Sequence, residues 1–144
     1  MHPKLKKTRG FTLIEVLIAV LILSIGLLSM ALTQVNSMRS THSSHLRTQA
    51  TFLADDILDS IRANRVKAEA GDYDIAIGVP ASGTGTMALD DLNTWKGNLA
   101  GMLPAGDGAI ARDVATGEVT VTVQWKDRDD ATNNPTQFQV STIP

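Results

Sequence analysis

The stretch GFTLIEVLIAVLILSIGLLSMAL, residues 10–32, decides how this chain folds. From Phe11 to Leu32 it holds fourteen Leu, Ile, Val or Phe side chains. A helix over these residues would be about 33 Å long, which matches the hydrocarbon core of a bilayer. Insertion gains about 4 to 8 kcal/mol from the apolar side chains, and the one carboxylate, Glu15, opposes it by about 3 kcal/mol or less. The stretch therefore predicts a membrane-spanning helix.

Charge is distributed unevenly around this stretch. The ten residues up to Gly10 carry four cations and no acid, so the positive-inside rule predicts that they stay in the cytoplasm and that the chain beyond Leu32 lies outside. Without those cations, nine basic residues remain against fifteen acidic ones, a net charge of −6. An acidic chain argues against nucleic acid as a partner, because phosphate binding needs clustered Lys and Arg. The four cations are Lys4, Lys6, Lys7 and Arg9.

The chain lacks the residue patterns of an enzyme. It has no cysteine, which excludes a disulfide, a lipid-anchoring thioether and a thiolate nucleophile. Neither a G-x-S-x-G turn, a phosphate-binding loop nor a zinc pattern is present. We therefore predict no catalytic residue, no cofactor and no small-molecule substrate.

The run Gly10-Phe11-Thr12-Leu13-Ile14-Glu15-Val16-Leu17 resembles the type III signal of type IV prepilins and pseudopilins. The resemblance implies that a prepilin peptidase and methylase cuts between Gly10 and Phe11 and that the new amino group of Phe11 is methylated. It also implies that Glu15 neutralises the amino terminus of a neighbouring subunit during assembly. The physical reason is that an unpaired carboxylate is strongly disfavoured in hydrocarbon.

Two other interpretations of the apolar stretch were open. A conventional secretory signal would be cut after the small residues of Ser29-Met30-Ala31. An uncleaved single-pass anchor could carry an unrelated domain. Neither interpretation explains why an acid occupies the fifth position after a Gly-Phe junction.

Helical periodicity continues beyond the apolar stretch. Because no proline occurs between residues 4 and 79, we expect one helix from about Phe11 to about Ala70, ended by Gly71 as a left-handed cap. Its second half carries charged residues on one face and an apolar stripe on the other. The stripe is Leu46, Ala50, Leu53, Ile57 and Ile61, widened by Phe52 and Leu58.

The remaining residues predict a small mixed head. A second helix is expected after Asp90 or Asp91 as its N-cap, with Leu92, Trp95, Leu99 and Met102 on its apolar face. Alternating residues predict antiparallel strands, which would form a three- or four-stranded sheet laid against the long helix. The fold class is therefore α+β and type IV pilin-like. The expected strands are Tyr73–Ile77, Ala109–Val114, Val119–Trp125 and Phe138–Thr142.

These elements divide the chain into four expected segments. They are a leader at 1–10, a transmembrane or filament-core half-helix at 11–32, an amphipathic half-helix at 33–70 and a globular head at 71–144.

The later sequence resembles the PilV type of minor pilin, in the segments Arg47–Ala50, Asp56–Arg65 and Leu103–Gly108 and in Trp95 and Trp125. The resemblance implies a subunit that primes or supports pilus assembly, attachment and twitching motility. Its partners would be other minor and major pilins, the inner membrane and the pilus assembly platform. The head would lie in the periplasm and later in the pilus, at its tip. A minor pseudopilin of a type II secretion system and a pilus-borne adhesin are the alternatives.

Three residue groups invite other functions. The loop Asp127–Asn134 is rich in oxygen ligands but lacks the glycine and glutamate of an EF-hand, so a solvated turn is favoured over a calcium site. His42 and His45 have no third metal ligand nearby and predict an exposed surface. Trp95 and Trp125 lie among apolar residues and predict core packing. We expect no metal site.

Overall fold

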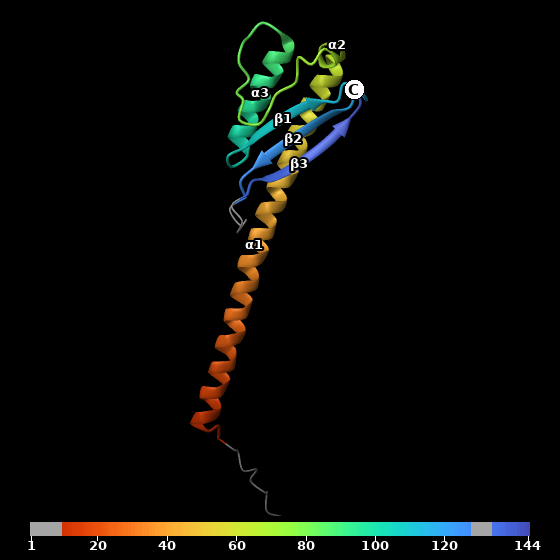
Figure 1. The fold of residues 1–144 in the computed structure, drawn as a ribbon. Helices are drawn as coiled ribbons and strands as arrows, with labels where there is room; N and C mark the ends of the chain where they lie inside the picture. Colours follow the sequence, from red (N-terminus) through yellow and green to blue (C-terminus); the bar gives the residue numbers. More distant parts are fainter. Residues whose placement is uncertain (1–9, 128–133) are drawn as a thin grey trace, which may run out of the picture. The chain divides into compact units, whose positions relative to one another are not determined.

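The computed structural model describes residues 10–127 and 134–144. Two compact units, Met1–Ser40 and Thr41–Pro144, are described separately. Helix α1 begins in the first unit and ends in the second, where it packs against a three-stranded antiparallel sheet (Figure 1). The fold is α+β and pilin-like, as the sequence predicted. Its elements are α1 (Leu13–Ala63), α2 (Arg65–Glu69), α3 (Met87–Met102), β1 (Asp107–Arg112), β2 (Val119–Trp125) and β3 (Thr136–Thr142).

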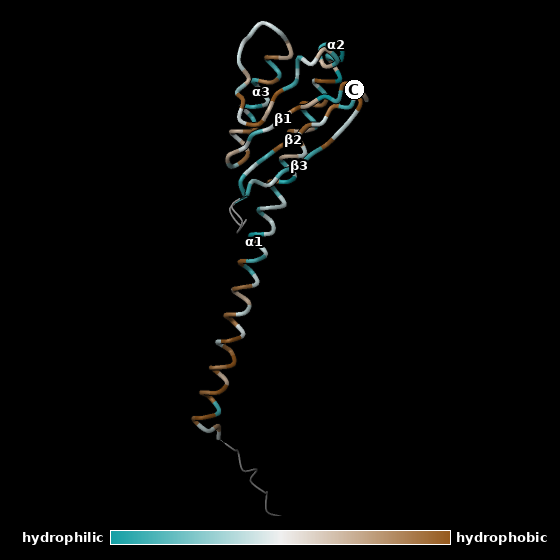
Figure 2. Tube along the Cα trace, in the orientation of Figure 1, coloured by the Kyte–Doolittle hydropathy of each residue, from teal (hydrophilic) through white to brown (hydrophobic). Residues whose placement is uncertain are grey.

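The first unit is the apolar part of α1. Its large apolar side chains between Leu13 and Leu32 are 52–80% exposed, so this unit has no core of its own. Figure 2 shows the hydrophobic colouring along these turns. The helix begins at Leu13, two residues later than expected from the sequence. Thr12, a favoured N-cap residue, precedes the helix, and its carbonyl accepts hydrogen bonds from the amides of Glu15 and Val16.

The second unit has one hydrophobic core, to which α1 contributes a stripe of side chains. The expected stripe residues are all buried, and so is Leu58. Phe52 was wrongly assigned to the stripe, because it is 68% exposed. It lies one residue, or about 100°, round the helix from Leu53 on the side away from the core. The buried stripe is Leu46, Ala50, Leu53, Ala54, Ile57, Leu58 and Ile61.

The single helix expected to reach Ala70 is interrupted near its end. Asn64 leaves the helical region of backbone space, with φ −118° and ψ 46°, and the short helix α2 follows. The predicted cap at Gly71 is confirmed, since this residue has φ +87°. The Gly71 amide donates a hydrogen bond to the Ala68 carbonyl at 3.0 Å. The Asp72 amide donates one to the Lys67 carbonyl, also at 3.0 Å. This is a Schellman motif, which satisfies the last carbonyls of α2.

Helix α3 begins earlier than the sequence predicted. Thr86 is its N-cap, because the Thr86 hydroxyl accepts a hydrogen bond from the amide of Leu89 at 3.3 Å. The expected caps, Asp90 and Asp91, therefore lie inside the helix. The apolar face is confirmed for Leu92, Trp95 and Leu99, whereas Met102 is 57% exposed. Leu103, which follows the helix, is buried close to the end of that face.

The sheet has the order β1-β2-β3, and both pairings are antiparallel. The prediction for β2 is confirmed at both ends, and its four alternate residues Val119, Val121, Val123 and Trp125 are buried. Both β1 and β3 begin two residues earlier than expected, at Asp107 and Thr136.

The predicted strand Tyr73–Ile77 is wrong, because only one isolated bridge forms, between Ile75 and Ile110. The bridge consists of two backbone hydrogen bonds, of 2.9 and 2.8 Å. Gly78 adopts φ +79° directly afterwards, a conformation that turns the chain away from an extended strand. The sheet consequently has three strands within the described residues.

Candidate functional site

The Gly10–Phe11 junction lies outside the helix. Gly10 and Phe11 are both exposed, and regular helical structure starts only at Leu13. Phe11 is 83% exposed. An exposed, non-helical backbone is the kind of segment that proteases reach most easily.

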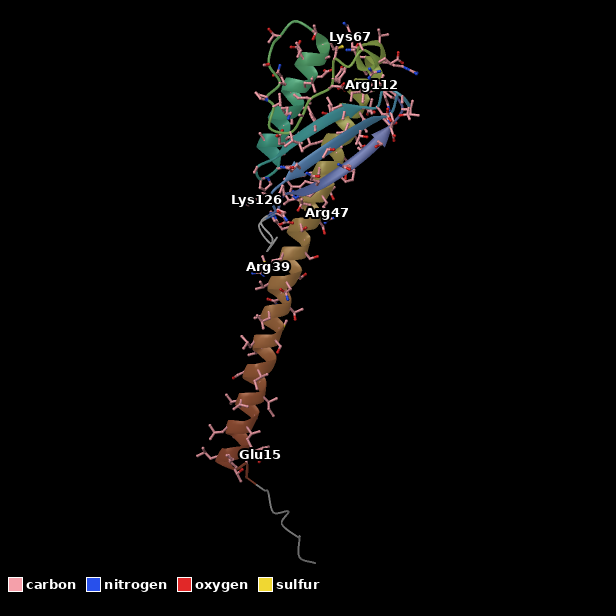
Figure 3. The ribbon with its side chains drawn as sticks, in the orientation of Figure 1. Glu15, Arg39, Arg47, Lys67, Arg112 and Lys126 are labelled. Atoms are coloured by element: carbon pink, nitrogen blue, oxygen red, sulfur yellow. The ribbon has the colours of Figure 1, made fainter. Side chains whose placement is uncertain are left out.

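Glu15 lies in the first turn of α1, four residues after Phe11. A carboxylate at this end of a helix is stabilised by the helix dipole, typically by about 0.3–1 kcal/mol. Within residues 10–127 and 134–144, no hydrogen bond or ion pair is made by the Glu15 side chain. Figure 3 shows it among the apolar side chains of the helix. A charged side chain in apolar surroundings needs a partner, and for Glu15 that partner has to come from outside the described residues.

Two serine hydroxyls farther along the apolar stretch bond within the helix. Ser24 donates to the carbonyl of Val20 at 2.7 Å, and Ser29 donates to that of Ile25 at 3.0 Å. Such bonds to the carbonyl four residues earlier allow Ser to enter a hydrocarbon environment. These two serine bonds could have been predicted from the sequence, because each joins residues four apart in one helix. Glu15, the one acid of the stretch, makes no such bond within the described residues.

Helix α1 also has the length and composition needed to cross a membrane. Its most apolar 18-residue window has a mean hydropathy of 2.6. None of that window is buried against the rest of the chain. Its apolar surface therefore has to be covered by lipid or by another protein.

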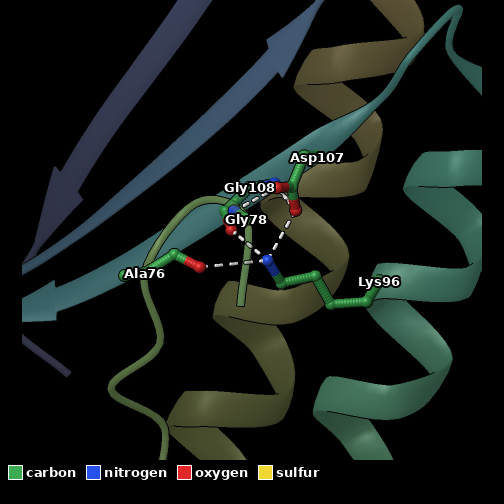
Figure 4. A network of polar contacts seen from close by, with 5 residues as sticks. All are labelled: Ala76, Gly78, Lys96, Asp107 and Gly108. Carbon is green, nitrogen blue, oxygen red and sulfur yellow. Dashed lines mark hydrogen bonds and ion pairs between the residues drawn. The ribbon is translucent and has the colours of Figure 1, made fainter. Parts of the chain in front are cut away.

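A cationic side chain in the head is held by three oxygen atoms. The Lys96 Nζ donates to Asp107 Oδ1 at 2.5 Å, to the Gly108 carbonyl at 2.6 Å and to the Ala76 carbonyl at 3.3 Å (Figure 4). Asp107 also accepts hydrogen bonds from the amides of Gly78 and Gly108. Burial opposes ionisation of Asp107, but these hydrogen bonds and the Lys96 charge outweigh it and lower the pKa of the carboxyl.

This Lys96 network connects α3, β1 and the segment before α3. Since both charged groups are fully engaged with each other and with the backbone, the arrangement positions structure and offers no free acid or base. No local pattern predicted this network, because Ala76, Lys96 and Asp107 meet only through the tertiary fold.

A second polar network surrounds Tyr73. Its hydroxyl donates to Asp91 at 2.6 Å and accepts from Asn64 at 3.2 Å, which joins the α1–α2 junction to α3. Burial, reinforced by the Asp91 carboxylate, raises the pKa of Tyr73 to about 12. The phenol therefore remains protonated at physiological pH and acts as a structural hydrogen-bond donor.

The other residues singled out in the sequence lie apart from any such site. His42 and His45 are exposed, and no cluster of three metal-ligating side chains occurs in the described part of the chain. Trp95 and Trp125 are each 1% exposed and fill the core, as predicted. The interior of the loop Asp127–Asn134 and the leader residues 1–9 lie outside the described residues.

Comparison with known proteins agrees with the geometry at the start of α1. Residues 5–31 match the family model described as the prokaryotic N-terminal methylation motif. This match supports a type IV pilin or pseudopilin family, and it points to a structural protein and not to an enzyme. Neither the curated proteins nor the solved structures contain a significant match.

The motif has consequences for processing and location. A prepilin-type signal implies processing by prepilin peptidase and association with other pilins. Together with the exposed apolar helix, it fits a pilin anchored in the inner membrane.

Proposed function

We propose that the protein is a minor pilin of the PilV type, made as a precursor with the leader 1–10 and matured by cleavage between Gly10 and Phe11. The mature chain would be methylated at Phe11. Its apolar half-helix, 11–32, would anchor it in the inner membrane and later enter the filament core. The amphipathic half-helix 33–70 would carry the head, 71–144, in the periplasm.

The observation that carries the proposal is the position of Glu15. Its carboxylate lies one helical turn from the Gly10–Phe11 junction, in an apolar helix, and has no partner in the described residues. Cleavage would create a cationic amine on Phe11, with an ordinary pKa near 8. A neighbouring subunit could bring such an amine to Glu15, which would favour docking in one register. In this way the subunit would prime or support pilus assembly.

The decisive experiment is the intact mass and amino-terminal sequence of the protein recovered from membranes. A chain that starts at methylated Phe11 supports the proposal. A start at Met1 would instead indicate a plain membrane anchor, and a start near Leu32 a conventional secreted domain.

Deletion of the gene then separates the two kinds of filament. The proposal expects fewer pili and weaker attachment and twitching, with protein secretion unchanged. Normal piliation with impaired secretion would assign the protein to a type II secretion system. Normal numbers of pili with lost binding to a surface would favour an adhesin.

A further inference from the structure

The head contains a cavity of about 340 Å³ whose position differs from every site described above. Its lining comes from α2, the end of β1, the β1–β2 turn and the residues after β3. The charged and polar lining residues are Arg65, Glu69, Arg112 and Thr116, with Ile143 on the apolar side.

Arg112 is the unusual member of this lining. The side chain is partly buried, and its Nε atom is fully buried without a hydrogen-bond partner in the described residues. The chain itself covers that atom, so the part of the guanidinium left to meet a group that enters the cavity is its terminal nitrogens. The acid in the lining, Glu69, pairs with Arg65 at 2.7 Å, and no bond joins it to Arg112 within the described residues. Figure 3 shows where Arg112 lies in the head.

Large apolar side chains are exposed around the same cavity. Ile143, which lines it, is 66% exposed. Val66 and Val114 are each 78% exposed; Val66 follows the lining residue Arg65, and Val114 lies two residues from both Arg112 and Thr116 in the sequence. An arginine surrounded by exposed apolar side chains is a composition enriched in protein–protein interfaces.

We propose that this cavity, the Arg112 pocket, receives a carboxylate side chain from a neighbouring pilin-type subunit. The inference rests on the proposed function, which provides such neighbours. A guanidinium binds a carboxylate through two parallel N–H···O bonds, which its two terminal Nη groups can supply. The chain itself displays exposed carboxylates of this kind, including Asp55 and Asp56 on α1. Glu69 in the lining disfavours a doubly charged phosphate more than a singly charged carboxylate.

The test places a photo-reactive amino acid at position 114 of the full-length chain in intact, piliated cells, and a second one at position 66. After illumination, the covalent adducts are isolated and the linked peptides are identified by mass spectrometry. We expect a peptide that contains Asp or Glu, from a protein with a prepilin signal. The amino terminus of the same sample is sequenced, so that processing is established independently.

Charge variants then test the role of Arg112. Arg112→Glu should reduce the adduct yield about tenfold or more, since a like charge would face the incoming carboxylate. Arg112→Lys keeps the charge but loses the paired bonds and should give an intermediate yield. Arg47→Glu is the matched control, an exposed cation on α1 outside the pocket, and should leave the yield unchanged. Because Arg112 makes no hydrogen bond or ion pair within the described residues, Arg112→Lys should leave the melting temperature of the head unchanged. If Arg112→Glu fails to fold, Arg112→Gln replaces it.

The proposal is overturned by an adduct yield that does not depend on Arg112, by linked peptides without Asp or Glu, or by attachment to phospholipid. Absence of any adduct at both positions also overturns it. If Phe11 is not the amino terminus, the proposed function fails. If Phe11 is the amino terminus and the adduct yield does not depend on Arg112, only the pocket inference fails.

Discussion

The two units of this chain are both rich in apolar residues, but they use them differently. Side chains such as Ile18 and Leu28, in the first unit, are 52% and 64% exposed, whereas Ile57 and Ile61, farther along the same helix, are 2% and 0% exposed. One helix thus contains a segment that completes its packing within the chain and a segment that does not. The contrast indicates that the second unit carries its own stability, while the first acquires partners from lipid or other subunits.

The largest effect should come from Gly10→Val, which tests the first unit without touching the head. A branched side chain at the cleavage position should block processing, because the prepilin resemblance implies a peptidase that requires a small residue there. Intact mass should show the full leader retained. The head should melt as in the native protein, and normal maturation of this variant would refute the assigned cleavage site.

Glu15→Val should allow insertion and cleavage but prevent most assembly. Removing the charge favours membrane insertion by up to about 3 kcal/mol, yet it also removes the group proposed to pair with the Phe11 amine of a neighbour. Membrane fractionation, amino-terminal sequencing and filament counts measure the three steps separately. Glu15→Asp keeps the charge and should retain more filaments, whereas normal piliation in Glu15→Val would contradict the pairing.

The same small substitution should destabilise the head in the second unit and leave its stability unchanged in the first. In Gly108→Ala the new Cβ would lie 2.5 Å from Trp95 Cη2 and 2.9 Å from the Thr122 carbonyl oxygen. Such overpacking costs about 1–3 kcal/mol, and each kcal/mol lowers the melting temperature by roughly 4–8 °C in a domain of this size. At Gly26 the new Cβ would meet no atom within 4 Å.

Tryptophan fluorescence reports the thermal unfolding of the head, since both tryptophans belong to it. Gly26→Ala should leave the melting temperature of the head unchanged. Gly101→Ala, an exposed site on α3 with open space, is the control within the head and should raise stability by about 1 kcal/mol. Equal melting temperatures for Gly108→Ala and Gly101→Ala would show that the head is loosely packed.

The two buried tryptophans should respond unequally to replacement by phenylalanine. Trp95 Nε1 donates to the Leu53 carbonyl at 2.9 Å, a bond that links α3 to α1, whereas Trp125 Nε1 is buried without a partner in the described residues. Trp95→Phe should therefore cost about 1 kcal/mol more than Trp125→Phe. Denaturant unfolding followed by circular dichroism measures the difference, and a larger loss from Trp125→Phe would contradict this assignment.

The smallest expected effect is a dependence of head stability on acid. Because the folded state lowers the pKa of Asp107, its contribution is complete above the ordinary value of about 3.9 and is lost as the pH falls through the folded value. Melting temperatures between pH 2 and pH 6 should fall less steeply for Asp107→Asn and Lys96→Gln than for the native chain. Equal slopes would show that the Lys96 network does not affect folding.

Much of the fold could be predicted from local patterns. The stripe on α1 recurs at helical spacing, and β2 alternates strictly from Val119 to Trp125, so both elements were identified with their buried faces. Gly71 was recognised as a cap because left-handed backbone suits glycine. The errors at Phe52 and Met102 arose because periodicity identifies a helix face but not its width.

The candidate site also has a part that the sequence predicted and a part that it did not. Gly10, Phe11 and Glu15 form a short motif within one segment, so the sequence was sufficient to propose them. That Glu15 has no partner within the described residues, whereas Ser24 and Ser29 bond within the helix, emerged only from the structure. The Lys96 network and the Arg112 pocket join residues distant in the chain and were not predicted.

The sequence alone determined the apolar helix, the processing motif and the main strand, because each depends on neighbours within a few residues. Tertiary structure decided where α1 is interrupted, which residue caps α3, and that Tyr73–Ile77 contributes a single bridge instead of a strand. It also decided which polar groups are satisfied. The physical reason is that burial and hydrogen bonding depend on surfaces brought together from distant parts of the chain, and local preferences do not encode which surfaces those are.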